Sequence, residues 1–171
     1  MKDKEQEYKE IFLAEALDNF EEINRLLTSL EKNLNDKNTI HALFRITHTL
    51  KGNAMGLGFG DIAELSHVME DIFNEVKKGS IALDEELFNS LFKANDKLGE
   101  LIQALKTDKK VAYKGIKTKL EVYLKNALNN TSPAIEKDGD NSLPEIISEA
   151  DKIVREQEKN YYFYPYSYKD K

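Results

Sequence analysis

Apolar side chains recur every three or four residues through four successive stretches of this chain, and this spacing constrains the fold more than any other feature. The spacing places the apolar residues on one face of an α-helix, and that face then needs a partner surface to bury it. Alternation with a period of two, which is typical of strands, is nowhere sustained. The clearest stripe comprises Leu13, Leu17, Phe20, Ile23, Leu27, Leu30 and Leu34.

Polar and glycine residues divide the first half of the pattern into two helices. The polar run 35–38 ends the first helix, and a second is predicted to begin near Asn38 or Thr39. The second helix should stop in the glycine-rich segment 56–60, because glycine favours helix ends. The residues of this helix expected to face inward are Ile40, Leu43, Ile46, Thr47, Leu50, Ala54 and Leu57.

Two further helices follow the glycine-rich segment. Asp61, with Glu64 three residues later, has the spacing of a capping box, so the third helix is predicted to begin at Asp61. Lysines followed by Gly79 are typical of its end. Its expected inward residues are Ile62, Leu65, Met69, Ile72 and Val76, and the fourth helix is predicted over 84–105.

Four amphipathic helices joined by short connections predict an all-α fold, an antiparallel four-helix bundle. An additional fifth helix is expected within 111–127, packed against the bundle. The predicted domain spans residues 1–128, and a polar linker rich in Asn, Ser, Pro and Gly is expected over 129–142. A short C-terminal helix and a tyrosine-rich tail are expected over 143–171.

Composition excludes several classes of function. The formal net charge of -6 argues against nucleic acid as a partner, because binding to a phosphate backbone needs a concentrated basic surface. The chain has no cysteine, so thiolate catalysis and cysteine-ligated metals are excluded. No segment approaches the roughly 20 apolar residues of a membrane span, and the charged start does not resemble a signal peptide. We therefore expect a cytoplasmic protein.

His48 lies on the second predicted helix, off its apolar stripe, and shares one face with Lys51, Gly52 and Met55. A neutral imidazole is a competent nucleophile near pH 7. A phosphoryl group added to it would bring negative charge, and Lys51 is placed to compensate that charge. Glycine inside a helix costs about 1 kcal/mol relative to alanine. Gly52 therefore either gives access to His48 or lets a neighbouring helix approach.

The third predicted helix carries His67 and Glu70 three residues apart, on one side of its apolar stripe. In an antiparallel pair of helices both side chains could face His48. A carboxylate commonly fixes the tautomer of a working histidine by accepting a hydrogen bond from one ring nitrogen. Glu70 is the candidate for that role, and a solvated surface glutamate is the alternative.

A di-iron carboxylate enzyme and a non-catalytic interaction protein are two alternatives for a helical bundle. Glu64 and His67 match the Glu-x-x-His ligand pair of di-iron carboxylate bundles, but that site needs the motif twice. The other histidines, His41 and His48, have Asn38 and Arg45 at that spacing instead of glutamate. A di-iron enzyme is therefore much less favoured. A non-catalytic helical-bundle interaction protein remains the main alternative. No cofactor is expected in either favoured case.

From Tyr8 to Leu128 the chain resembles a histidine-containing phosphotransfer domain, most similar to the amino-terminal phosphotransfer domain of CheA-type chemotaxis kinases. The specific part is a histidine-x-x-lysine-glycine core with a downstream histidine-x-x-glutamate. The segments that carry the resemblance are Ile11–Ala16, Leu43–Ala54, Leu57–Phe59 and Leu65–Asp71.

The resemblance implies a phosphorelay module in which His48 is the phosphorylated residue. It implies that a histidine kinase ATP-binding domain donates the phosphoryl group and that a response-regulator receiver domain accepts it. By the same matching Glu70 orients His48, while Lys51 and His67 border the phosphoryl site. A full kinase of this type has further domains, and the sequence contains no glycine-rich nucleotide box. A stand-alone phosphotransfer protein and a fragment of a longer kinase are both compatible with it.

Overall fold

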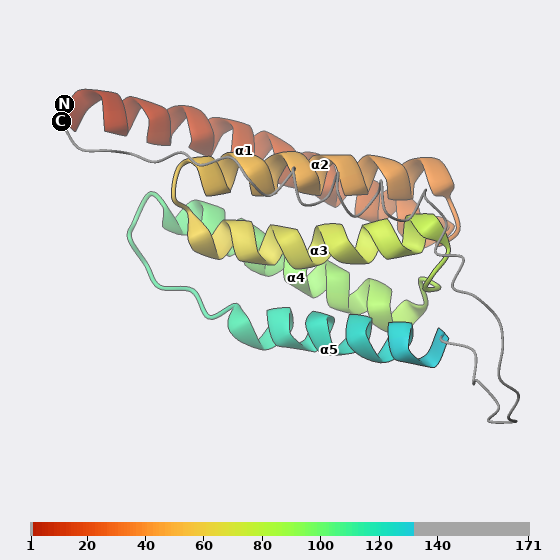
Figure 1. Cartoon of the computed structure of the whole chain (residues 1–171). Helices are drawn as coiled ribbons and strands as arrows, with labels where there is room; N and C mark the ends of the chain where they lie inside the picture. The colour runs from red at the N-terminus through yellow and green to blue at the C-terminus, as the bar shows by residue number, and fades with distance from the viewer. Residues whose placement is uncertain (1, 132–171) are drawn as a thin grey trace, which may run out of the picture. The chain divides into compact units, whose positions relative to one another are not determined.

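The computed structural model describes residues 2–131, which form five α-helices (Figure 1). Successive helices run antiparallel, and the described residues contain no strand. The predicted all-α helical bundle is confirmed. The helices are α1 (Lys2–Lys32), α2 (Lys37–Gly56), α3 (Gly60–Lys78), α4 (Glu85–Ala104) and α5 (Lys114–Thr131).

The first four helices surround one apolar core. Helix α1 packs against α2 and α4, α3 packs against α2 and α4, and the α2–α3 contact is the most extensive. Helix α5 lies against α3 and α4, as expected from its apolar residues (Figure 1). Side chains buried at the centre include Ile23, Leu27, Leu43, Leu50, Leu65, Met69, Ile72, Leu91 and Leu98.

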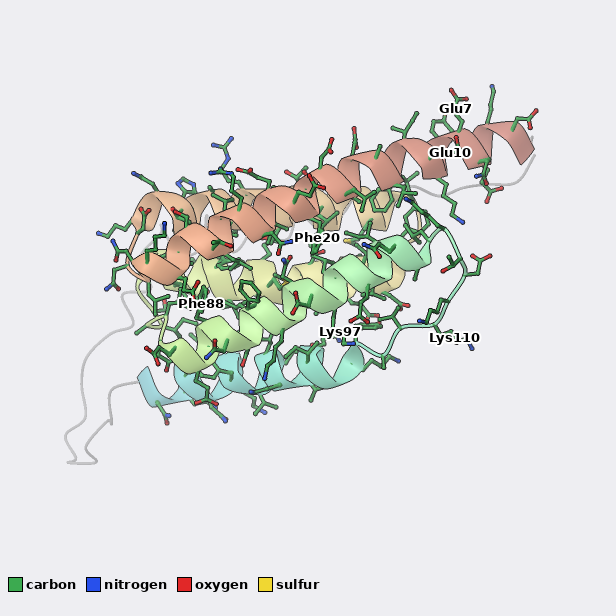
Figure 2. All side chains as sticks on the ribbon, turned by 180° about the vertical axis from the view of Figure 1, so that it is seen from behind. Glu7, Glu10, Phe20, Phe88, Lys97 and Lys110 are labelled. Carbon is green, nitrogen blue, oxygen red and sulfur yellow. The ribbon has the colours of Figure 1, made fainter. Side chains whose placement is uncertain are left out.

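Helix α1 is longer than its apolar stripe. It begins at Lys2, and its first turns project beyond the other helices (Figures 1 and 2). In this half of the helix Phe12 and Ala16 are buried, whereas Leu13 and Leu17 are only partly buried. The Phe12 ring stacks on the ring of Phe59, which follows α2, with centroids 4.7 Å apart. The buried face of this half of α1 therefore differs from the predicted stripe.

The capping box predicted at Asp61 and Glu64 is wrong. Helix α3 begins one residue earlier, and its N-cap residue Phe59 makes no side-chain capping bond. The Tyr113 hydroxyl lies 3.0 Å from Oδ1 of Asp61 and 2.7 Å from Oε2 of Glu64. Contacts with Tyr113 thus take the place of the local cap.

Leu57, predicted to face inward, is 42% exposed, because α2 ends at the preceding residue.

The start of α2 is capped as its polar residues suggest, one residue earlier than predicted. Asp36 is the N-cap, and its carboxylate accepts hydrogen bonds from the backbone N–H groups of Asn38 and Thr39. The Thr39 hydroxyl also donates to the same carboxylate. These bonds satisfy amides that have no partner within the helix.

Two tyrosines attach the last part of the domain. Tyr113 is buried just before α5 and connects to the first turn of α3. Tyr123, on α5, donates its hydroxyl to Asp84, the N-cap of α4. Burial, together with hydrogen bonds to Glu64 and Asp61, raises the pKa of Tyr113 well above its ordinary value. Burial and the bond to Asp84 raise the pKa of Tyr123 to about 12.

The raised pKa of Tyr113 predicts a loss of stability in alkali. Its folded pKa lies above its unfolded value near 10, so its contribution is complete below pH 10 and declines as the pH rises further. Tyr113→Phe is expected to cost about 1 kcal/mol at pH 8, with a smaller difference from the wild type at pH 11. Urea unfolding at both pH values measures this. Tyr8→Phe, at an exposed position, is the control, and an unchanged Tyr113→Phe difference would contradict the prediction.

Helix α5 extends slightly beyond the predicted boundary. Helix α5 continues to Thr131, so the first residues of the linker predicted over 129–142 are helical. Asparagines are poor helix formers, but extending an existing helix adds a hydrogen bond for each residue fixed. The remaining linker and the helix and tail predicted over 143–171 lie outside the described residues. No helix within 2–131 is long and apolar enough to cross a membrane.

Candidate functional site

Glu70 joins His48 and Lys51 in one cluster between α2 and α3. Glu70 lies on α3 and is only 8% exposed. Its Oε1 lies 2.7 Å from Nδ1 of His48, and its Oε2 lies 2.6 Å from Nζ of Lys51. The antiparallel pairing of the two helices therefore brings together three of the side chains singled out from the sequence.

The contact with Glu70 defines the chemistry of the His48 ring. A carboxylate only accepts hydrogen bonds, so Nδ1 of His48 carries the proton. In the neutral ring the lone pair then belongs to Nε2. The His48 side chain is 44% exposed, so the ring can be reached from solvent while Nδ1 contacts Glu70. This arrangement presents Nε2 as a nucleophile.

Lys51 pairs with Glu70, a contact that was not predicted from the sequence. Its side chain is only 12% exposed, and its ammonium forms an ion pair with Glu70. In this arrangement its charge balances the carboxylate that orients His48. Lys51 therefore belongs to the support of the histidine in the state that the structure describes.

Gly52 faces open space. A Cβ atom built at this position meets no atom within 4 Å outside its own helical surroundings, so no neighbouring helix requires a glycine here. At Gly99, by contrast, a Cβ atom would lie 2.5 Å from Cζ of Phe20, a side chain labelled in Figure 2. The approach of a neighbouring helix thus explains Gly99 and not Gly52. Access to the face that carries His48 remains a prediction for Gly52.

Gly52→Ala is expected to raise the free energy of unfolding by up to about 1 kcal/mol, because alanine favours the helix and the added methyl group meets nothing. Gly99→Ala is the matched comparison, and it is expected to be less stable because Phe20 must move. Urea unfolding of both variants tests the contrast. A destabilised Gly52→Ala variant would show that the glycine is needed for packing.

His67 is one turn from Glu70 on α3, but its ion pair is with Asp71 on its own helix. Its Nε2 lies 3.4 Å from Oδ2 of Asp71. Burial raises the pKa of the Asp71 carboxyl, and the charge of His67 opposes this shift. The structure thus places His67 on the same helix as Glu70, with Asp71 as its partner.

Two residues, Phe44 and Lys77, lie close to this site but were not predicted from the sequence. The Phe44 ring lies one turn before His48 on α2, with ring centroids 6.3 Å apart. The ammonium of Lys77, on α3, lies 4.0 Å from the centroid of that ring. Their positions in the sequence could have indicated this, because Phe44 is four residues from His48 and Lys77 is seven residues from Glu70. Both intervals keep residues on one helix face.

The carboxylate proposed as a di-iron ligand has other partners. Glu64 contacts the Tyr113 hydroxyl and lies 3.8 Å from Nζ of Lys117, while His67 is paired with Asp71. Within residues 2–131 no group of three or more histidine, aspartate or glutamate side chains is arranged to hold a metal ion.

Comparison with known proteins identifies the same region. A family model described as the Hpt domain matches residues 7–108. The chemotaxis protein CheA of Bacillus subtilis strain 168 is 30% identical over 99 residues, which cover 58% of this chain and 15% of that protein. The chain thus matches only a small part of that relative's length.

Two solved structures resemble the fold. The CheA phosphotransferase domain from Thermotoga maritima has 31% identity and a TM-score of 0.55, over 58% of this chain and 94% of that one. A solution structure of the histidine phosphotransfer domain of CheA has 23% identity and a TM-score of 0.63, over 81% of this chain and 98% of that one. The family model covers more than half of the chain, and the bundle agrees with it. The chain therefore belongs to the Hpt domain family and contains a phosphotransfer module.

Proposed function

We propose that His48 carries a phosphoryl group on Nε2, received from the ATP-binding domain of a CheA-type histidine kinase and passed to an aspartate of a response-regulator receiver. In this role the chain is a substrate and carrier of phosphate rather than a kinase. Glu70 orients His48, Lys51 balances Glu70, and Gly52 keeps the approach open.

The observation that carries the proposal is the 2.7 Å contact between Nδ1 of His48 and Oε1 of Glu70. In the first step the Nε2 lone pair attacks the γ-phosphorus of ATP, the N–P bond forms, and the bond to the bridging oxygen of ADP breaks. The ring becomes positive while Nδ1 keeps its proton. Glu70, buried and already bonded to Nδ1, stabilises this developing charge.

The second step reverses the changes at the ring. A carboxylate oxygen of the receiver aspartate attacks the phosphorus, the N–P bond breaks, and the electron pair returns to Nε2. The ring is again neutral with its proton on Nδ1, so one cycle leaves His48 and Glu70 unchanged. The protein contributes mainly position and charge, as is general for phosphoryl transfer.

Membership of the Hpt domain family supports phosphoryl transfer as the reaction, and the geometry of His48 supports Nε2 of this residue as the phosphorylated atom. The kinase and receiver are inferred from the relatives, which are much longer than the matched segment. Incubation of the chain with a CheA-type kinase and γ-labelled ATP is expected to give a label that is labile in acid and stable in alkali. Adding a receiver domain should then remove it.

Mass spectrometry and NMR of the labelled chain locate the phosphoryl group. We expect it on Nε2 of His48. Label on Nδ1, or on His41 or His67, would contradict the role proposed for the Glu70 contact. The absence of any labelling by several CheA-type kinases and by small phosphodonors would contradict the proposed function as a whole.

A further inference from the structure

The phosphoryl group that the proposed function places on His48 needs a cation, and Lys51 is already engaged. A phosphoryl group brings roughly -1.5 to -2 charges near pH 7. Lys51 is largely buried and lies 2.6 Å from a Glu70 oxygen, so moving it to the phosphoryl group would remove one of the two partners of the buried carboxylate. A second cation on the same face would avoid that cost.

Lys77 lies over the ring of Phe44, one helical turn from His48, and has no carboxylate partner among residues 2–131. Its ammonium lies 4.0 Å from the Phe44 centroid, and no ion pair of Lys77 occurs among the salt bridges of residues 2–131. The Phe44 ring is in turn 6.3 Å from the ring of His48. Lys77 is itself exposed, and a cation–π contact at an exposed site is weak. The ammonium can therefore leave Phe44 at small cost.

The residues around Lys77 favour this cation over its neighbours. Lys78, next in sequence, lies 3.3 Å from Oε1 of Glu75, and His67 is paired with Asp71. Glu70 and Asp71 already engage Lys51 and His67, so neither of these cations is free for the phosphoryl group without breaking an existing pair. The long, flexible lysine stem allows the ammonium to move by several Å without a change in α3.

We propose that Lys77 binds the phosphoryl group on His48, and that phosphorylation moves its ammonium from the Phe44 ring to the phosphoryl oxygens. Phe44 thereby holds the lysine one helical turn from His48 before the reaction. The inference rests on the proposed function of His48 and adds a phosphoryl-binding residue to it.

The movement is testable without a kinase. Phosphoramidate can phosphorylate the wild-type chain directly, with an N–P bond to His48 formed and ammonia released. In the unmodified protein the ε-methylene protons of Lys77 should be shifted upfield by the Phe44 ring current. On phosphorylation we expect that upfield shift to be lost, while the corresponding signals of Lys78 stay unchanged.

Variants separate binding from mere proximity. A cation beside the phosphoryl group lowers the pKa of its second ionisation, which lies near 6 for phosphorylated side chains. Lys77→Gln is expected to raise this pKa by a few tenths of a unit in ³¹P NMR, a difference that 1 M salt should largely remove. Lys77→Arg should keep the wild-type value, and Lys78→Gln is the matched control.

The outcomes distinguish this inference from the proposed function. Suppose that phosphoramidate phosphorylates His48. If the Lys77 signals then stay as in the unmodified protein, and the phosphoryl pKa of Lys77→Gln equals that of the wild type, the inference fails and the proposed function stands. If Lys78→Gln shifts the pKa as much as Lys77→Gln, the effect is general surface charge and the inference also fails. If His48 is not phosphorylated at all, both fail.

Discussion

Replacing His48 by glutamine is expected to abolish phosphorylation of this chain by a CheA-type kinase. Glutamine is polar and similar in length, but its amide nitrogen lends its electron pair to the carbonyl and is not a nucleophile. Since His48 is 44% exposed, its replacement should leave the core of the bundle intact. Labelled phosphate should fall to background, whereas the circular dichroism spectrum should not change.

His41→Gln is the matched control for this experiment. His41 is exposed and lies on the same helix, two turns before His48. The control loses one histidine from α2 but keeps the Glu70 contact, so its labelling should equal that of the wild type. Equal labelling of His48→Gln and the wild type would remove His48 from the reaction, and reduced labelling of both variants would point to docking rather than chemistry.

Glu70→Gln is expected to slow phosphorylation by at least about tenfold, more than a conservative substitution usually would. The ammonium of Lys51 can only donate hydrogen bonds, so it should attract the oxygen of the new amide. The amide NH₂ group would then face Nδ1 of His48 and donate to it. That contact favours the tautomer with its proton on Nε2, which has no lone pair for the attack.

Two further variants test this tautomer argument. Glu70→Ala removes the orienting group without imposing the wrong tautomer, and it leaves Lys51 without its counter-charge. In the double variant Glu70→Gln with Lys51→Met, the amide oxygen is free to turn to Nδ1, so part of the lost rate should return. Single-turnover labelling gives the rates, and ¹⁵N NMR reports the tautomer. A slower double variant, or Nδ1 still protonated in Glu70→Gln, would contradict the mechanism.

Much of the site could be predicted from local spacing. Lys51 and Gly52 lie about one turn beyond His48, and His67 and Glu70 share one side of a second helix, so periodicity alone predicts these groupings. The contact between Glu70 and His48 followed only as a possibility of antiparallel pairing. Its distance required the register of α2 against α3, which depends on how the buried side chains of both helices interdigitate.

Other features could not be predicted, because they depend on elements distant in the sequence. Asp61 and Glu64 have the spacing of a cap, but Tyr113, from the connection before α5, contacts them instead. Gly52 and Gly99 are both helical glycines, and only Phe20 on another helix distinguishes them. A local pattern describes what a residue can do, and its neighbours decide which of these options it takes.

The sequence by itself determined the class of fold, the helices of the bundle and the candidate phosphorylated residue. These follow from the period of the apolar residues and from the chemistry of an imidazole on a polar helix face. Only the tertiary structure decided that Lys51 balances Glu70 and that Lys77 lies over Phe44. The physical reason is that charge partners are selected by distance in space, and that distance is determined by the packing of α2 against α3.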